Sequence, residues 1–147
     1  MLTTGQMQNF YCALYREEER EMNKYCKETG VGLIPWSPLG GGALARSRSI
    51  ATGETLRSTN NPFASVFADE HSHEIVKRVE EMAEKKGRTM TQVALAWLLE
   101  KGVSSPIVGL SSVKRMDEAL GVNGKMLSVE EVESIDEPYK ARSVVGH

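Results

Sequence analysis

The sequence predicts an α/β fold with parallel strands. Two short apolar runs, residues 31–34 and 106–110, are typical of strands buried in parallel sheets. Helical segments lie before, between and after these runs, which is the order of βα units. Right-handed crossovers would bring the carboxyl ends of both strands to one face, where a doubly wound sheet or a βα barrel binds its ligands. The pattern leaves both architectures open.

The composition indicates one water-soluble domain. The chain has 147 residues, of which 40% are hydrophobic and 26% charged, and its net charge is −2. Acidic and basic residues are interleaved, so we expect neither nucleic acid nor a membrane as partner. No signal peptide or transmembrane span is expected. Cys12 and Cys26 have neither metal-ligand nor disulfide spacing, which predicts reduced thiols, no metal site and a cytoplasmic location.

The first part of the chain predicts a strand and a helix. Residues 2–10 are short and polar, so they would form a weak edge strand or a first strand. Residues 16–29 predict a helix, because acidic residues occupy its first turns and Lys24 and Lys27 lie near its end. Gly30 is well placed to terminate it.

The middle of the chain predicts a loop and a second helix. Residues 43–69 show no sustained period, and loops of this length usually act as lids or binding loops. Residues 71–86 resume helical spacing and end at a glycine. His71 and His73 could ligate a metal in principle. No third ligand is near them in the sequence, so we interpret them as facing solvent.

Two capping boxes mark the starts of two further helices. Thr89 and Gln92 precede residues 93–99, an almost wholly apolar helix that must be buried. Ser128 and Glu131 open a last helix that runs toward the carboxyl terminus.

The end of the first apolar run suits a flat ring and a phosphate. Trp36 offers an aromatic face, Ser37 a hydroxyl, and residues 40–42 are glycines whose main-chain N–H groups a phosphate can approach. The alternative is a tight loop with a half-buried tryptophan, because a glycine-rich loop alone is weak evidence.

The end of the second run suits a second phosphate. Ser111, Lys114 and Arg115 lie where a strand ends and an amphipathic helix begins, so free N–H groups and cations converge there. That helix stops at Gly121 and carries an apolar side formed by Val113, Met116 and Leu120. The alternative is a serine cap followed by an exposed cationic face. Together the two strand ends match the two ends of a phosphorylated dinucleotide.

These motifs resemble the aldo-keto reductases, NADP-dependent βα-barrel enzymes. The chain is similar to the carboxyl-terminal half of that family, in the aryl-alcohol-dehydrogenase-like branch. The resemblance rests on residues 8–11 (QNFY), 30–40 (GVGLIPWSPLG), 91–97 (TQVALAW) and 106–118 (PIVGLSSVKRMDE), in the family's order. It implies a partial (βα) TIM-type barrel, roughly the last three βα units plus a C-terminal helix, with residues 1–147 as one half-barrel domain.

The resemblance implies that one end of NADP(H) binds at the first strand end. Gln8 would hold the nicotinamide carboxamide, and Trp36 would stack under the nicotinamide ring. Ser37, Leu39 and Gly41 would line the pyrophosphate.

The adenosine end of the cofactor would bind at the second strand end. The resemblance implies that Ser111 and Arg115 contact the 2′-phosphate and that Glu118 approaches the adenine amino group. The sequence departs from the family at Cys12 and Ala119, where asparagine is common. Because of Cys12, the loop after the first strand need not follow the family's pattern. Ala119 removes one adenine contact.

The resemblance implies NADP(H)-dependent reduction of aldehydes or ketones to alcohols, with a tyrosine proton donor tuned by lysine, aspartate and histidine. All four come from the amino-terminal half of the barrel, and a whole barrel takes roughly 250 residues. We therefore assign no catalytic residue, and we expect the chain to be inactive alone. None of its tyrosines has the context of the family's proton donor (Tyr11, Tyr15, Tyr25 and Tyr139). The alternative is a non-catalytic half-barrel module that associates with itself, as a homodimer, or with a partner.

Overall fold

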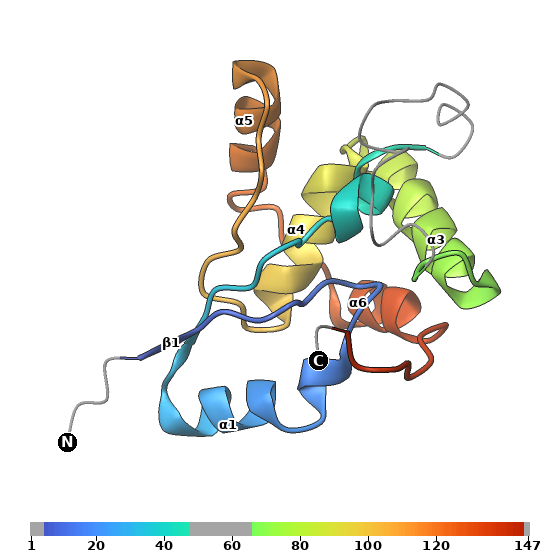
Figure 1. Ribbon diagram of the computed structural model, residues 1–147. Helices are drawn as coiled ribbons and strands as arrows, with labels where there is room; N and C mark the ends of the chain where they lie inside the picture. Colours follow the sequence, from blue (N-terminus) through green and yellow to red (C-terminus); the bar gives the residue numbers. More distant parts are fainter. Residues whose placement is uncertain (1–4, 48–65, 146–147) are drawn as a thin grey trace.

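Three extended segments lie side by side and run parallel. The computed structural model describes residues 5–47 and 66–145 (Figure 1). Strand β1 (Gln6–Met7) pairs with β2 (Gly32–Leu33), and the pairing continues in the same register to a bridge between Phe10 and Trp36. On the other side of β2, Ile107 bridges Trp36, and its N–H donates to the carbonyl oxygen of Pro35 at 2.8 Å. The predicted parallel strands are confirmed.

The third segment begins earlier than predicted. The N–H groups of Ser104 and Ser105 both donate to the carbonyl oxygen of Leu33, at 2.9 and 3.2 Å. The pairing therefore covers residues 104–107, whereas the predicted strand spans 106–110. Beyond Ile107 the chain leaves the sheet, and Leu110 is exposed.

The single helix predicted for residues 16–29 is wrong. A short 3-10 helix, η1 (Glu17–Glu19), is followed by helix α1 (Met22–Thr29), and the residue before each has no side-chain cap. The break has a tertiary cause, because Glu17 is buried and accepts hydrogen bonds from distant residues of the chain. The predicted end is right, since Gly30 takes the left-handed conformation with φ 73°.

Helices α3 (Glu70–Lys86) and α4 (Met90–Glu100) form as predicted. Asp69 caps α3 by accepting from the N–H of Ser72, and Thr89 with Gln92 forms the predicted capping box of α4. Helix α4 is buried on all sides over residues 90–98, which explains its apolar sequence.

Helix α5 (Val113–Leu120) stands apart from the other helices in Figure 1. Its predicted amphipathic pattern is present, but the apolar side is uncovered: Val113 is 69% exposed and Leu120 59%. Only Ala119 of this helix is buried. The last helix, α6 (Val129–Asp136), opens with the predicted capping box of Ser128 and Glu131.

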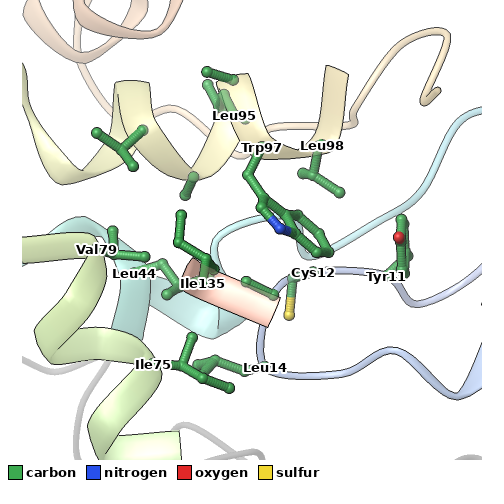
Figure 2. Packing of buried hydrophobic residues seen from close by; sticks show 14 of the residues in the cluster. Tyr11, Cys12, Leu14, Leu44, Ile75, Val79, Leu95, Trp97, Leu98 and Ile135 are labelled. Atoms are coloured by element: carbon green, nitrogen blue, oxygen red, sulfur yellow. The ribbon is translucent and has the colours of Figure 1, made fainter. Parts of the chain in front are cut away.

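The core surrounds α4. In Figure 2, Trp97 and Leu98 of α4 face side chains from α3, α6 and the segment after β1, among them Val79, Ile135 and Leu14. The largest side chains that are almost completely buried include Trp97, Tyr11, Tyr15, Leu14, Leu44 and Ile75. Cys12 and Cys26 are both free thiols, as predicted, and both are buried.

Most of the predicted loop 43–69 lies outside the described residues, which omit 48–65. Its first residues belong to a 3-10 segment, η2 (Gly40–Ala45). Within the described ranges, no helix has both the length and the apolar character to cross a bilayer.

Candidate functional site

Trp36 lies at the carboxyl end of the middle segment and is held on both sides. Its main-chain N–H donates to the carbonyl oxygen of Asn9 at 2.9 Å. Its main chain also forms β-bridges with Phe10 and Ile107 on the two neighbouring segments. Its indole is half-buried and stacks on the ring of Phe10, with centroids 4.4 Å apart and planes inclined by 18°. The arrangement fixes the plane of the indole, as a stacking platform requires.

Gln8 shares a side of the sheet with Phe10. The two residues are two positions apart in an extended segment, so their side chains point to the same side. Because Phe10 pairs with Trp36, the exposed side chain of Gln8 lies on the side that carries the indole. The amide of Gln8 and the ring of Trp36 therefore lie on neighbouring segments.

The turn after Trp36 holds a run of left-handed backbone. Ser37 has φ 53°, and Gly40, Gly41 and Gly42 have φ 58°, 66° and 101°. The glycines suit these angles, and a Cβ on Gly40 would also lie 3.1 Å from the side chain of Leu14.

This turn offers main-chain N–H groups to a ligand. Gly40 donates to the carbonyl oxygen of Ser37 at 2.9 Å, and Gly42 donates to that of Leu39 at 3.0 Å. Across residues 5–47 and 66–145, no hydrogen bond involves the N–H of Leu39 or Gly41. Successive N–H groups in such turns form concave sites that favour anions.

The start of α5 carries two cationic side chains, those of Lys114 and Arg115. The cap is Ser112, whose hydroxyl oxygen accepts from the N–H of Arg115 at 3.3 Å, so the alternative prediction of a serine cap is confirmed there. Ser111 lies one residue earlier and is exposed, as is Lys114. The guanidinium of Arg115 forms no ion pair within the described part of the chain. A ligand role for Ser111 and Arg115 stays a prediction.

Glu118 is half-buried on the last turn of α5. Its carbonyl oxygen accepts from the side-chain amide of Gln92 at 3.1 Å, which ties α5 to the start of α4. Ala119 is buried, in contrast to most of α5. The position at which the resemblance implies an asparagine is therefore a buried one.

Cys12 occupies a tight and buried turn. Cys12 and Tyr15 exchange main-chain hydrogen bonds of 3.1 and 2.9 Å, and the thiol is completely buried. The loop after the first strand is thus buried and closed by main-chain hydrogen bonds. Burial raises the pKa of the Cys12 thiol to about 12.

Two tyrosines serve structural roles. The Tyr11 hydroxyl donates to the carboxylate of Glu19, and the Tyr139 hydroxyl donates to that of Glu17 at 2.7 Å. Burial and the adjacent carboxylate raise the pKa of both phenols above the usual value.

The carboxyl-terminal segment is a feature that sequence reasoning missed. Residues 139–145 return to the start of the chain: the N–H of Arg142 donates to Glu17 at 2.7 Å, and that of Val145 donates to the Tyr15 hydroxyl at 3.0 Å. The Arg142 guanidinium also pairs with Asp69 at 3.1 Å. No local pattern signals contacts between residues so distant in the sequence.

The two histidines lie at a surface groove. His71 and His73 line an open surface groove with Glu70, Glu74 and Lys77. Among the described residues, no cluster of histidine, cysteine and acidic side chains could hold a metal ion.

Parallel segments joined by helices, with an aromatic and a glycine turn at their carboxyl ends, define an α/β protein of the βα type. The model of the aldo/keto reductase family matches residues 4–140, and the chain belongs to that family. It is 48% identical over 143 residues to an aldo-keto reductase of Fusarium vanettenii. It is 47% identical over 134 residues to a putative aryl-alcohol dehydrogenase of Schizosaccharomyces pombe.

These alignments cover most of this chain and a smaller part of each relative. They include 96% and 90% of this chain and 38% of each of the two fungal proteins. Among solved structures, a thermostable aldo-keto reductase in complex with the inhibitor epalrestat matches with a TM-score of 0.66 and 25% identity, over 91% of this chain and 39% of that one. The resemblance to the family and to its aryl-alcohol dehydrogenase branch is confirmed. The chain spans about two fifths of the length of these relatives.

Proposed function

We propose that this chain is the NADP(H)-binding part of an aldo-keto reductase that reduces aldehydes or ketones to alcohols. The observation that carries the proposal is the half-buried indole of Trp36, fixed at a strand end and followed at once by the left-handed glycine turn. The first feature suits a nicotinamide ring and the second suits a pyrophosphate. When bound, the cofactor would supply the hydride.

The residues at the first strand end fit the nicotinamide and the pyrophosphate. Gln8 would donate to the carboxamide from the segment next to Trp36. The N–H groups of Leu39 and Gly41 would meet the pyrophosphate, together with the hydroxyl of Ser37.

The start of α5 fits the adenosine 2′-phosphate. Ser111 and Arg115 would bind that group, because the Arg115 guanidinium forms no ion pair with the described residues and its planar fork suits a phosphate. Glu118, one turn further along α5, would approach the adenine amino group. This set of contacts favours NADP(H) over NAD(H).

The catalytic step needs groups that we assign to none of these residues. The resemblance to the family assigns proton donation to a tyrosine of the amino-terminal half. We infer that residues 1–147 act as one cofactor-binding half-barrel domain, in the cytoplasm, and do not turn over a carbonyl substrate alone. Turnover would require the remaining strand–helix units of a barrel.

Self-association is proposed as well, on the evidence of uncovered apolar side chains. Val113, Met116 and Leu120 form one side of α5 and are all exposed, and Ile107 is exposed nearby in the sequence. An exposed apolar helix side of this kind favours association over exposure to water. A homodimer is the simplest assembly that would cover it.

A binding measurement tests the cofactor proposal. NADPH is titrated into the purified chain by calorimetry, into a Trp36→Leu variant, and into a Tyr25→Leu variant as control, because Tyr25 is an exposed aromatic on α1. We expect binding by the wild type and the control, and a loss of about 2- to 10-fold in Trp36→Leu, since a stacked aromatic pair contributes roughly 0.5–1.5 kcal/mol. A folded wild-type chain that does not bind NADPH would refute the proposal.

A further inference from the structure

Phe10 lies in the middle of a column of three aromatic rings. Its ring stacks on Trp36, with centroids 4.4 Å apart and planes inclined by 18°, and on Tyr15, with centroids 4.4 Å apart and planes inclined by 8°. Two rings that both stack at this distance on a third must lie on its opposite faces. The order of the column is therefore Trp36, Phe10, Tyr15.

The far end of the column is fixed. Tyr15 is 1% exposed, and its main chain exchanges hydrogen bonds with Cys12 across a tight turn. Its hydroxyl accepts from the N–H of Val145 at 3.0 Å, so the carboxyl-terminal segment holds it in place. Phe10 is 4% exposed and touches a further ring at its edge, that of Phe67, at 6.3 Å and 60°.

The near end of the column is the half-buried indole at the strand end. Phe10 covers one face of that indole, so a ligand ring that stacks on Trp36 cannot use that face. A platform whose plane is already fixed also needs less ordering when the ligand binds, which favours affinity.

We propose that Phe10 is a positioning residue for the cofactor: it fixes the plane of Trp36 and directs the nicotinamide to the indole face away from Phe10. Phe10 acts through Trp36 and does not touch the cofactor. The inference rests on the proposed function. It adds the face of the Trp36 indole on which the nicotinamide binds, and it names Phe10 as the residue that determines this face.

The first test needs no substitution. Nuclear Overhauser contacts are measured between the nicotinamide protons of bound NADPH and the aromatic protons of the wild-type chain. We expect contacts to the indole of Trp36 and none to the ring of Phe10. Contacts to the Phe10 ring would overturn the inference while leaving cofactor binding intact. Absence of any contact to Trp36 would instead overturn the proposed function.

The second test separates positioning from core packing. Phe10→Leu removes the stacked ring and keeps apolar volume, and Phe67→Leu is the matched control because Phe67 meets Phe10 only at a tilt. The chain is labelled with 5-fluorotryptophan, and the Trp36 fluorine resonance is assigned with a Trp36→Phe variant. We expect Phe10→Leu, but not Phe67→Leu, to shift or broaden that resonance and to weaken NADPH binding about 2- to 10-fold. Equal effects of the two variants on the resonance and on affinity would overturn the inference, because a role in packing alone predicts them.

Discussion

The side-chain amide of Gln92 donates a hydrogen bond to the carbonyl oxygen of Glu118, with nitrogen and oxygen 3.1 Å apart. Gln92 belongs to the capping box of α4, and its amide oxygen accepts from Lys125 at 3.1 Å. A Cβ on Gly121 would lie 2.6 Å from the same amide nitrogen, so the glycine makes room for it. One side chain thus ties the start of α4 to the end of α5, the helix that carries the proposed phosphate ligands.

Replacing Gln92 by alanine should therefore loosen α5 and destabilise the fold. The hydrogen bond from the N–H of Thr89 and the bond to Glu118 are lost together, so we expect the free energy of unfolding to fall by about 1–3 kcal/mol. Urea denaturation measures it. Gln92→Glu is the control, because a carboxylate keeps the acceptor toward Thr89 and cannot donate to Glu118, and it should lose less. An alanine variant as stable as the wild type would contradict the role given to Gln92.

Asp69 should titrate well below an ordinary aspartate. Burial by itself would raise its pKa, but the hydrogen bonds from the N–H and hydroxyl of Ser72 and the charge of Arg142 outweigh burial and lower the pKa to about 2. The unfolded value is about 3.9. The contribution of Asp69 to stability is therefore present above pH about 4 and is lost as the pH falls toward about 2.

Carboxyl carbon NMR measures this titration directly, with urea denaturation between pH 2 and 6 beside it. Asp69→Asn should lower the free energy of unfolding at neutral pH. It should also make that free energy fall less as the pH is lowered into the acid range. Asp117→Asn, which removes an exposed carboxylate of α5, should leave that fall unchanged. A midpoint near 4 for Asp69 would show that the bonds to Ser72 and Arg142 do not form in solution.

Neither thiol should react in the folded chain. Cys12 and Cys26 are both buried, and burial raises the pKa of Cys12 to about 12, so almost no thiolate is present at pH 8. We expect Ellman's reagent to modify no cysteine until urea unfolds the chain, and then to modify both. Rapid modification of either thiol without denaturant would mean that this part of the core opens readily.

The uncovered side of α5 should drive self-association. Burying a side chain such as Val113 or Leu120 contributes roughly 1.5–3 kcal/mol, so replacing each by lysine should weaken a dimer more than about tenfold. Light scattering over a range of concentrations measures the mass. Tyr25→Lys is the control, because Tyr25 is as exposed as Leu120, at 59%, on a different helix. A wild-type chain that stays monomeric at high concentration would refute the association.

Local signals predicted the helices well, and long-range contacts account for the errors. The capping boxes at Thr89 and Ser128 act between neighbours in the sequence, so their helices begin where expected. The helix predicted across residues 16–29 breaks because Glu17 binds Tyr139 and the main chain of Arg142, which lie at the other end of the chain. Periodicity cannot reveal such a contact.

In the candidate site, too, local features could be predicted and the packing of distant segments could not. The turn after Trp36 could be predicted, because proline and glycine act on the backbone locally. A serine cap before α5 could also be predicted, and the structure places it at Ser112. The stack of Phe10 between Trp36 and Tyr15 depends on how separate segments pack, and no spacing in the sequence signals it.

The preference for NADPH over NADH tests the account most directly, because it depends on Arg115 at the proposed 2′-phosphate site. Calorimetric titration of both cofactors into the wild type should show a preference of roughly 10- to 150-fold for NADPH, since a charge-assisted hydrogen bond contributes about 1.5–3 kcal/mol. Arg115→Ala should erase the preference, and Lys114→Ala, which removes the neighbouring exposed cation, should leave most of it. An NADPH-to-NADH ratio that Arg115→Ala leaves unchanged would contradict the account.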